Sequence, residues 1–124
     1  MFTGFEHAGI ASPEPQKLAQ WYVAHLGFSM SCNSASTVFV NAPDGSMLEI
    51  LRSDGPRSTQ TLREPGIRHI AVAVDDFEKA FDSLKAKEVQ FISEPIFRPG
   101  LKVVFFTDGE GNFLHLIYRE QPAA

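Results

Sequence analysis

The sequence of 124 residues predicts an α+β fold made of two tandem β-α-β-β-β modules, whose strands form a curved mixed sheet around a shared cleft. Three observations predict it: the second half of the chain repeats the first, each half has one helical stretch among short strands, and glycine or proline turns separate the strands. One module alone would leave a sheet face bare. We therefore expect a single domain over residues 1–124, with module 1 at 1–53, a linker at 54–65 and module 2 at 66–124.

Two pairs of matching segments establish the repeat. His7–Ala11 and His69–Ala73 each place a histidine before a run of small and apolar residues, 62 positions apart. Asp44–Leu51 matches Glu110–Ile117 at a spacing of 66 positions, so the second copy contains a small insertion. Two copies in the same order indicate a tandem duplication.

The first half is expected to begin with a strand at Phe5–Ala11 and to continue into a helix. Ser12 followed by Pro13 is typical of an N-cap with proline at the first helical position. Gly27 is expected to end this helix. Its apolar face comprises Leu18, Trp21, Tyr22 and Leu26. The three strands expected after it are Phe28–Cys32, Thr37–Asn41 and Met47–Arg52.

The second half repeats this series of elements. A strand is expected at Ile67–Val74, and Asp75 with Glu78 three residues later is typical of a capping box at a helix start. The apolar positions of that helix are Phe77, Ala80, Phe81 and Leu84. The three strands expected to follow are Val89–Ser93, Leu101–Thr107 and Phe113–Arg119.

Composition narrows the class of protein. Apolar residues make up 44% and charged residues 21%, as in ordinary globular proteins. A net charge of −4 argues against a nucleic-acid partner. The apolar runs are too short to span a membrane, and the first residues lack the features of a secretory signal, so a cytoplasmic location is expected. The lone Cys32 excludes an intrachain disulfide and a zinc site with several cysteines.

Four polar residues occupy two repeat-equivalent positions. His7 and His69 lie in the first strand of each copy, and Glu49 and His115 lie in the last. An ionisable side chain inside an apolar strand is costly unless it is paired or coordinated. A two-fold relation between the copies would bring three imidazoles and one carboxylate together. We therefore predict that the cleft binds one divalent ion, either Zn, Ni, Mn or Fe.

Other interpretations of these residues remain open. A single histidine in an apolar strand is commonly a core residue with its hydrogen bonds satisfied. Glu49 could pair with Arg68 or Arg52 at the surface. His25 is not part of the set, because it falls in the last turn of the first helix, where a cation complements the helix dipole.

Several segments also carry a resemblance to a known family, namely His7–Ile10, Trp21–Tyr22 with Leu26–Phe28, Leu48–Ile50, Arg68–Val72 with Val74–Asp76, and Asp108–Leu114. With these segments the sequence resembles the vicinal oxygen chelate superfamily. That superfamily includes glyoxalase I, bleomycin and fosfomycin resistance proteins, methylmalonyl-CoA epimerase and extradiol dioxygenases. The resemblance covers nearly the whole chain and implies the paired-module fold.

The resemblance places the metal ligands on His7, Glu49, His69 and His115. Position 115 departs from the pattern of glyoxalase I, which has there a glutamate that is also the proton-transferring base. The extradiol and fosfomycin-resistance patterns likewise have a carboxylate at that position. By the internal symmetry Glu49 would take the mirrored carboxylate role and act as general base. His115 would be a fourth ligand, or the base if it is not a ligand.

The activity implied by the resemblance is that of a metal-dependent lyase or isomerase similar to glyoxalase I. Its small-molecule substrate would chelate the metal through two neighbouring oxygens, with the metal acting as a Lewis acid. No residue indicates glutathione as a co-substrate. Four basic residues could meet an anionic substrate or simply be solvated surface charges: Arg63, Arg68, Arg98 and Lys102.

Two other functions remain open. One is an Fe(II) ring-cleaving dioxygenase, and the other is a non-catalytic resistance protein that binds a drug or metabolite in an aromatic-lined cleft. The substrate contacts expected are Trp21, Phe39, Arg98 and Phe105. Because a short chain of two modules leaves edge strands that need covering, we also expect a homodimer.

Overall fold

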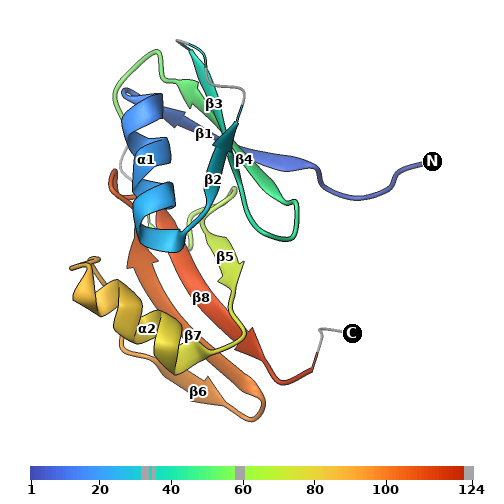
Figure 1. Ribbon diagram of the computed structural model, residues 1–124, viewed down its shortest axis with the longest axis vertical. Helices are drawn as coiled ribbons and strands as arrows, with labels where there is room; N and C mark the ends of the chain where they lie inside the picture. Colours follow the sequence, from blue (N-terminus) through green and yellow to red (C-terminus); the bar gives the residue numbers. More distant parts are fainter. Residues whose placement is uncertain (32–33, 35, 58–60, 122–124) are drawn as a thin grey trace. The chain divides into compact units, whose positions relative to one another are not determined.

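The computed structural model describes residues 1–31, 34, 36–57 and 61–121 (Figure 1). The chain divides into two compact units, Met1–Ser58 and Thr59–Ala124. The first contains β1 (His7–Ser12), α1 (Pro15–Leu26), β2 (Ser29–Ser31), β3 (Thr37–Asn41) and β4 (Met47–Arg52). The second contains β5 (Ile70–Ala73), α2 (Phe77–Ala86), β6 (Ile96–Arg98), β7 (Leu101–Thr107) and β8 (Phe113–Arg119). The α+β class and the duplicated order of elements are confirmed.

Both units have the same sheet topology. The strand order is β1-β4-β3-β2 in the first and β5-β8-β7-β6 in the second. In each sheet the first strand is parallel to the last, and the other neighbours are antiparallel. Gly9 lies opposite Glu49, and Ala71 lies opposite His115. The repeat in the sequence is therefore a repeat in strand register.

In the first unit, α1 covers one face of the sheet (Figure 1). Leu18, Ala19 and Tyr22 of the helix are buried. The strand residues that are buried with them alternate along β3 and β4: Val38, Val40, Leu48 and Ile50. Because successive residues of a strand point to opposite faces, Phe39 and Glu49 lie on the face away from α1.

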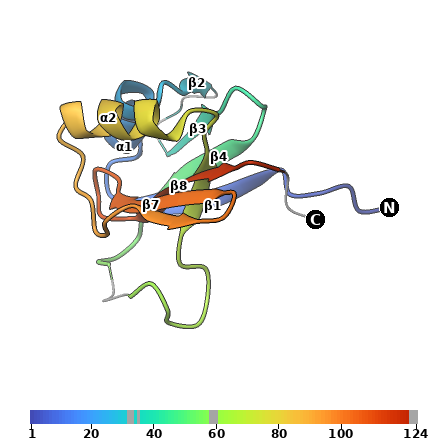
Figure 2. The same cartoon turned by 90° about the horizontal axis from the view of Figure 1, so that it is seen from below.

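The second unit is packed in the same way, with α2 running along one face of its sheet (Figure 2). Phe77 and Leu84 are the buried residues of α2. The alternating buried strand residues are Val104, Phe106, Leu114 and Leu116. By the same alternation Phe105 and His115 lie on the face away from α2. In both units the helix-covered face forms the apolar core and leaves the polar positions on the other face.

The first helix starts later than the sequence predicted. Strand β1 continues through Ser12, and α1 begins at Pro15 with Glu14 as the N-cap residue. The Ser12 hydroxyl accepts a hydrogen bond from the Glu14 backbone N–H at 2.9 Å, so it closes the turn before the helix instead of capping it. The proline at the start of the helix is thus Pro15 and not Pro13. The prediction chose the wrong one because both prolines suit the first helical position equally well by sequence.

The other helix boundaries lie close to the predicted ones. Asp76, not Asp75, caps α2, and its Oδ1 accepts the Lys79 backbone N–H at 3.1 Å. Gly27 ends α1 as predicted, with a φ of 73° and its N–H donating to the Val23 carbonyl. This left-handed φ favours glycine at the position.

One strand of the second unit was misplaced. Val89–Ser93 was expected to be a strand, but it contributes only an isolated bridge between Phe91 and Phe106, and strand β6 is Ile96–Arg98. The Ser93 hydroxyl accepts a hydrogen bond from the Phe105 backbone N–H at 2.9 Å. This side-chain bond takes the place of the backbone hydrogen bond that would continue the strand pairing. The inserted residues of the second copy therefore lengthen the hairpin that ends in β7.

Strand ends differ by a few residues elsewhere. The strand expected at Phe5–Ala11 is His7–Ser12, and that expected at Ile67–Val74 is Ile70–Ala73. The strand expected at Phe28–Cys32 is Ser29–Ser31, and Cys32 lies outside the described residues. In the described part of the chain, no helix has the length and apolar character needed to span a membrane.

Candidate metal centre

The first unit brings His7 and Glu49 together. The two residues lie on the neighbouring strands β1 and β4, offset by two positions in register, so their side chains share one face of the sheet. His7 Nε2 is 3.5 Å from Glu49 Oε1, and the side chains are 35% and 26% exposed. The pair is thus accessible, and forms an ion pair when His7 is protonated.

The proton on neutral His7 is placed by a neighbouring carboxylate. Nδ1 lies 2.6 Å from Oε1 of Glu6, which can only accept, so Nδ1 carries the hydrogen. The Nε2 lone pair then faces Glu49. Two ligands about 2.1 Å from one ion lie about 3.0–3.4 Å apart in octahedral or tetrahedral geometry. The 3.5 Å separation of these two acceptors therefore fits a shared cation.

The second unit brings His69 and His115 together. His69 directly precedes β5, with the same two-position offset from His115 that His7 has from Glu49. The two imidazole ring centroids are 4.7 Å apart. His115 Nδ1 is 3.1 Å from the Leu116 carbonyl oxygen and donates to it, which leaves the Nε2 lone pair unprotonated. Metal-ligating histidines commonly donate their second ring N–H to a carboxylate or carbonyl in this way.

Burial keeps His115 neutral. The residue is 7% exposed, and the resulting desolvation lowers the pKa of its imidazole below the usual 6.5. The Leu116 carbonyl raises this pKa, whereas His69 and Arg119 lower it further. A neutral imidazole at neutral pH can bind a metal ion or accept a proton.

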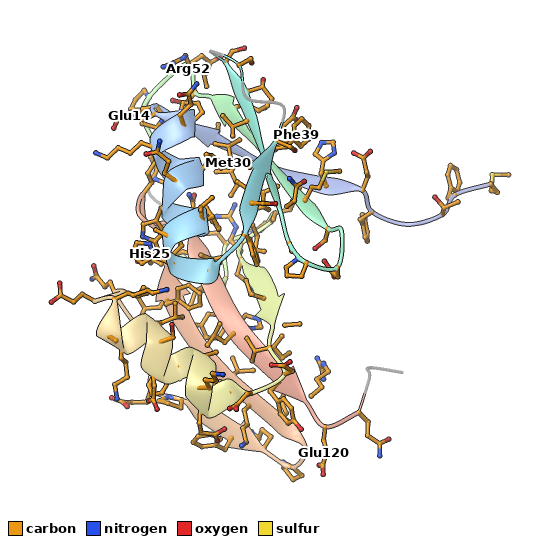
Figure 3. All side chains as sticks on the ribbon, viewed as in Figure 1. Glu14, His25, Met30, Phe39, Arg52 and Glu120 are labelled. Carbon is orange, nitrogen blue, oxygen red and sulfur yellow. The ribbon has the colours of Figure 1, made fainter. Side chains whose placement is uncertain are left out.

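Each pair has a phenylalanine beside it at an equivalent position. Phe39, which is labelled in Figure 3, lies opposite Glu49 in the β3–β4 register. Its ring stands edge-on to His7 at 5.9 Å and 84°. Phe105 lies opposite His115, and its ring stands edge-on to His69 at 5.8 Å and 83°. These two predicted substrate residues therefore accompany the predicted ligands.

Each unit thus holds half of the predicted ligand set, and we call the two pairs the half-sites: His7 with Glu49, and His69 with His115. Neither unit alone gathers three or more His, Cys, Asp or Glu side chains in a metal-binding group among its described residues. The binding of one ion by all four stays a prediction.

The other two predicted substrate residues make different contacts. The Trp21 ring stacks on His25 one helical turn later, at 4.5 Å and 13°. His25 Nδ1 also lies 2.9 Å from the Trp21 carbonyl, in the last turn of α1 as predicted. Arg98 is exposed at the end of β6 and donates to the carbonyl of Phe97 at 3.0 Å. None of these contacts joins Trp21 or Arg98 to the half-site of its own unit.

The surface partners considered for Glu49 are engaged elsewhere. Arg52 Nη1 donates to the Pro13 carbonyl at 3.0 Å, and Arg68 Nη1 lies 3.4 Å from Glu64. Glu6, which contacts His7, was not among the predicted site residues. Its position directly before His7 was the available signal, but an exposed acidic residue outside the apolar run carries little information.

The chain is similar in sequence to a characterised enzyme. The chain is 32% identical over 100 residues to "Methylmalonyl-CoA epimerase, mitochondrial" of Homo sapiens, covering 73% of this chain and 57% of that protein. The chain thus spans little more than half the length of this relative.

Solved structures of low identity share the fold. A glyoxalase/bleomycin resistance protein/dioxygenase from Alicyclobacillus acidocaldarius matches with a TM-score of 0.75 at 18% identity, covering 93% of this chain and 90% of that one. The oxidase ChaP-H2 matches with a TM-score of 0.76 at 22% identity, covering 96% and 95%. A family model matches residues 4–116, and the chain therefore belongs to the glyoxalase/bleomycin resistance protein/dioxygenase superfamily.

Proposed function

We propose that the protein is a divalent-metal-dependent lyase or isomerase that moves a proton at a carbon next to a carbonyl group. The half-sites carry this proposal. His7 with Glu49 and His69 with His115 occupy equivalent register positions in the two units, where they offer imidazole nitrogens and a carboxylate. Superfamily membership and the similarity to an epimerase support it, since an epimerase inverts a stereocentre.

The residues present suit a first-row divalent ion. The proposed ligands are His7, Glu49, His69 and His115, a set of three imidazoles and one carboxylate that suits Zn, Ni, Mn or Fe. When bound, the ion would act as a Lewis acid toward two neighbouring oxygens of the substrate. Glu6 and the Leu116 carbonyl orient the rings of His7 and His115, and thereby keep Nε2 of each available.

Glu49 is the proposed general base. It supplies the carboxylate of the set, and one of its two oxygens can accept a proton while the other faces a cation. It would take the proton from the carbon beside the carbonyl and return it to the product. The neutral ring of His115 is the second candidate for this role, because burial lowers its pKa.

The first test is the metal content of protein purified without a histidine tag. We expect about one divalent ion per chain, lost after His7→Ala and also after His69→Ala, because both half-sites serve the same ion. Metal that persists in either variant contradicts the shared site. Wild-type protein that contains no metal and binds an aromatic compound tightly would favour the alternative of a sequestering protein, in which Phe39 and Phe105 contact the ligand.

The second test is proton exchange in heavy water with methylmalonyl-CoA, the substrate named in its human relative, as the probe. We expect the metal-loaded protein to introduce deuterium at the carbon between the two carbonyl groups. Glu49→Gln should slow this by about 10²–10⁴-fold with the metal site saturated, the usual contribution of a general base. Glu14→Gln, which removes an exposed carboxylate of the same unit, is the control. Unchanged exchange in Glu49→Gln would exclude Glu49 as the base.

A further inference from the structure

A pocket of about 470 Å³ opens in the second unit, just before strand β5. Residues 62–64 and 66–69 line it, so it is made by one short stretch of chain. His69, a residue of the second half-site, forms part of its wall. A group bound in the pocket would therefore lie beside a proposed metal ligand.

The charged residues of the pocket give it a positive balance. Arg63 and Arg68 face a single acidic residue, Glu64. Arg68 Nη1 donates to Glu64 Oε2 at a long 3.4 Å. Arg63 is exposed and takes part in no ion pair with the described residues. The pocket therefore offers more positive than negative charge to a ligand.

Arg68 holds donors that the protein does not satisfy. Its side chain is 22% exposed, and its Nε is buried without a hydrogen-bond acceptor among the described residues. The guanidinium lies against Gly66, where an added Cβ would be 3.2 Å from Nη2. Gly66 has a φ of 113°, which also favours glycine. A buried donor without an acceptor is costly, so an incoming acceptor would be favoured here.

We propose that this pocket binds an oxyanion, either a carboxylate or a phosphate group, through the guanidinium groups of Arg68 and Arg63. Arginine presents parallel N–H donors that match the paired oxygens of both groups. Binding in this way requires the Arg68 guanidinium to turn so that the buried Nε and Nη2 face the bound oxygens. Leu62 and Ile67 also line the pocket, and Ile67 is 88% exposed, so the ligand can carry a short hydrocarbon part.

This inference narrows the substrate class. If the proposed function holds, the substrate is a small organic acid or a phosphate ester whose anionic group sits beside His69 while its reacting carbon lies at the metal. Only this extension to the substrate rests on the proposed function. Binding of the oxyanion itself requires neither the metal nor Glu49, so the two proposals can fail separately.

The test is an NMR titration of the arginine side chains. Protein labelled with ¹⁵N-arginine is freed of metal and then of chelator, because chelators are themselves carboxylates. The Nε–H signal of Arg68 is identified by its loss in Arg68→Lys. Sodium phosphate and sodium propionate are the two probes, and sodium chloride at equal ionic strength is the control. We expect a saturable shift of the Arg68 signal with phosphate, propionate or both, and none with chloride.

Variants locate the binding. Affinity for the effective probe, followed through backbone amide shifts of Gly66 and Ile67, should fall at least about tenfold in Arg68→Gln, because the hydrogen bonds lost involve a charged group. Arg68→Lys should also bind the probe more weakly than the wild type, although it keeps the positive charge. Lys79→Gln, which removes a positive charge from helix α2, should bind as the wild type does. Circular dichroism checks that each variant is folded.

Each outcome decides the proposal. Tighter binding of phosphate assigns a phosphate-bearing ligand, and tighter binding of propionate assigns a carboxylic acid. The proposal is overturned if neither probe gives a saturable shift, or if folded Arg68→Gln binds as tightly as the wild type. Glu49→Gln should keep the oxyanion shift even if it loses turnover, which separates a failure of the pocket from a failure of the proposed reaction.

Discussion

Replacing Asp108 with alanine should destabilise the turn that joins β7 to β8. Asp108 is 5% exposed, and its carboxylate accepts hydrogen bonds from the backbone N–H groups of Glu110 and Asn112 at 2.9 and 3.0 Å. It also accepts the side-chain amide of Asn112 at 2.8 Å. The two strands that this turn connects carry Phe105 and His115, so the turn supports the second half-site.

The expected loss follows from these three bonds. A hydrogen bond to a charged group contributes about 1.5–3 kcal/mol, so three bonds set an upper limit of roughly 5–9 kcal/mol. Gly109 and Gly111 in the same turn are exposed, so water can reach some of the freed N–H groups. We therefore expect Asp108→Ala to lower the free energy of unfolding by about 2–4 kcal/mol, which corresponds to a melting temperature roughly 10 °C lower.

Urea unfolding followed by circular dichroism measures this change. The midpoint should fall while the slope with urea stays constant, because the surface exposed on unfolding is nearly the same. Asp44→Ala is the matched control, because Asp44 lies in the corresponding turn between β3 and β4. Its carboxylate accepts hydrogen bonds from the Ser46 backbone N–H at 3.0 Å and from the Ser46 hydroxyl at 2.6 Å. Unlike Asp108, Asp44 is fully exposed. It should leave the midpoint unchanged. Equal midpoints for Asp108→Ala and the wild type, or equal losses in both variants, would refute the reasoning.

Two further predictions concern pH and assembly. Burial lowers the pKa of His115 below 6.5, so on acidification the unfolded chain binds a proton before the folded chain does, and the stability of the metal-free protein should fall as pH drops through and below about 6.5. His115→Gln should flatten this dependence in urea unfolding across that range, and an unchanged slope would contradict the assignment. We also propose a homodimer, because each sheet has two edge strands, β1 and β2 or β5 and β6. Light scattering at micromolar concentration should give twice the chain mass, and a monomer mass would exclude it.

The sequence predicted strands well where alternation was strong. Thr37–Asn41 and Met47–Arg52 have the predicted bounds, because apolar residues that are buried alternate with the other positions along each strand. Ile96–Arg98 was missed, since it lies between Pro95 and Pro99 and its strand conformation depends on pairing with β7. Such pairing depends on residues distant in the sequence, so local patterns do not reveal it.

Helix starts were displaced by one or two residues for a local reason. Pro13 and Pro15 both suit the first turn of a helix, and Asp75 and Asp76 both suit an N-cap. The choice depends on where the preceding strand ends, and β1 continues to Ser12 because it is paired with β4. Sequence alone does not determine the length of that pairing.

The candidate site could be predicted as pairs because the repeat aligns its members. Aligning the copies equates His7 with His69 and Glu49 with His115, and a shared register offset makes each pair contact. Trp21 was assigned to the substrate from its aromatic character alone. Its helical position places His25 four residues later on the same helix face, and the two rings stack there.

The duplication also explains why a histidine at position 115 is compatible with metal chemistry. In each unit the position concerned is the third residue of the last strand, on the face away from the helix, and a phenylalanine lies opposite it. Glu49 and His115 are thus two occupants of one structural position.

The environments of Glu49 and His115 differ, since the side chain of Glu49 is 26% exposed and His115 is buried with a lowered pKa. A carboxylate is costly in the buried position, whereas a neutral imidazole is not. Of the two proposed ligands, the carboxylate thus stands at the more exposed position and the neutral imidazole at the buried one. Transferring the carboxylate with His115→Glu would require burying it, so we expect this variant to lose stability unless metal is bound. Unfolding of the variant with and without Zn²⁺ measures this, and a variant as stable as the wild type without metal would contradict the argument.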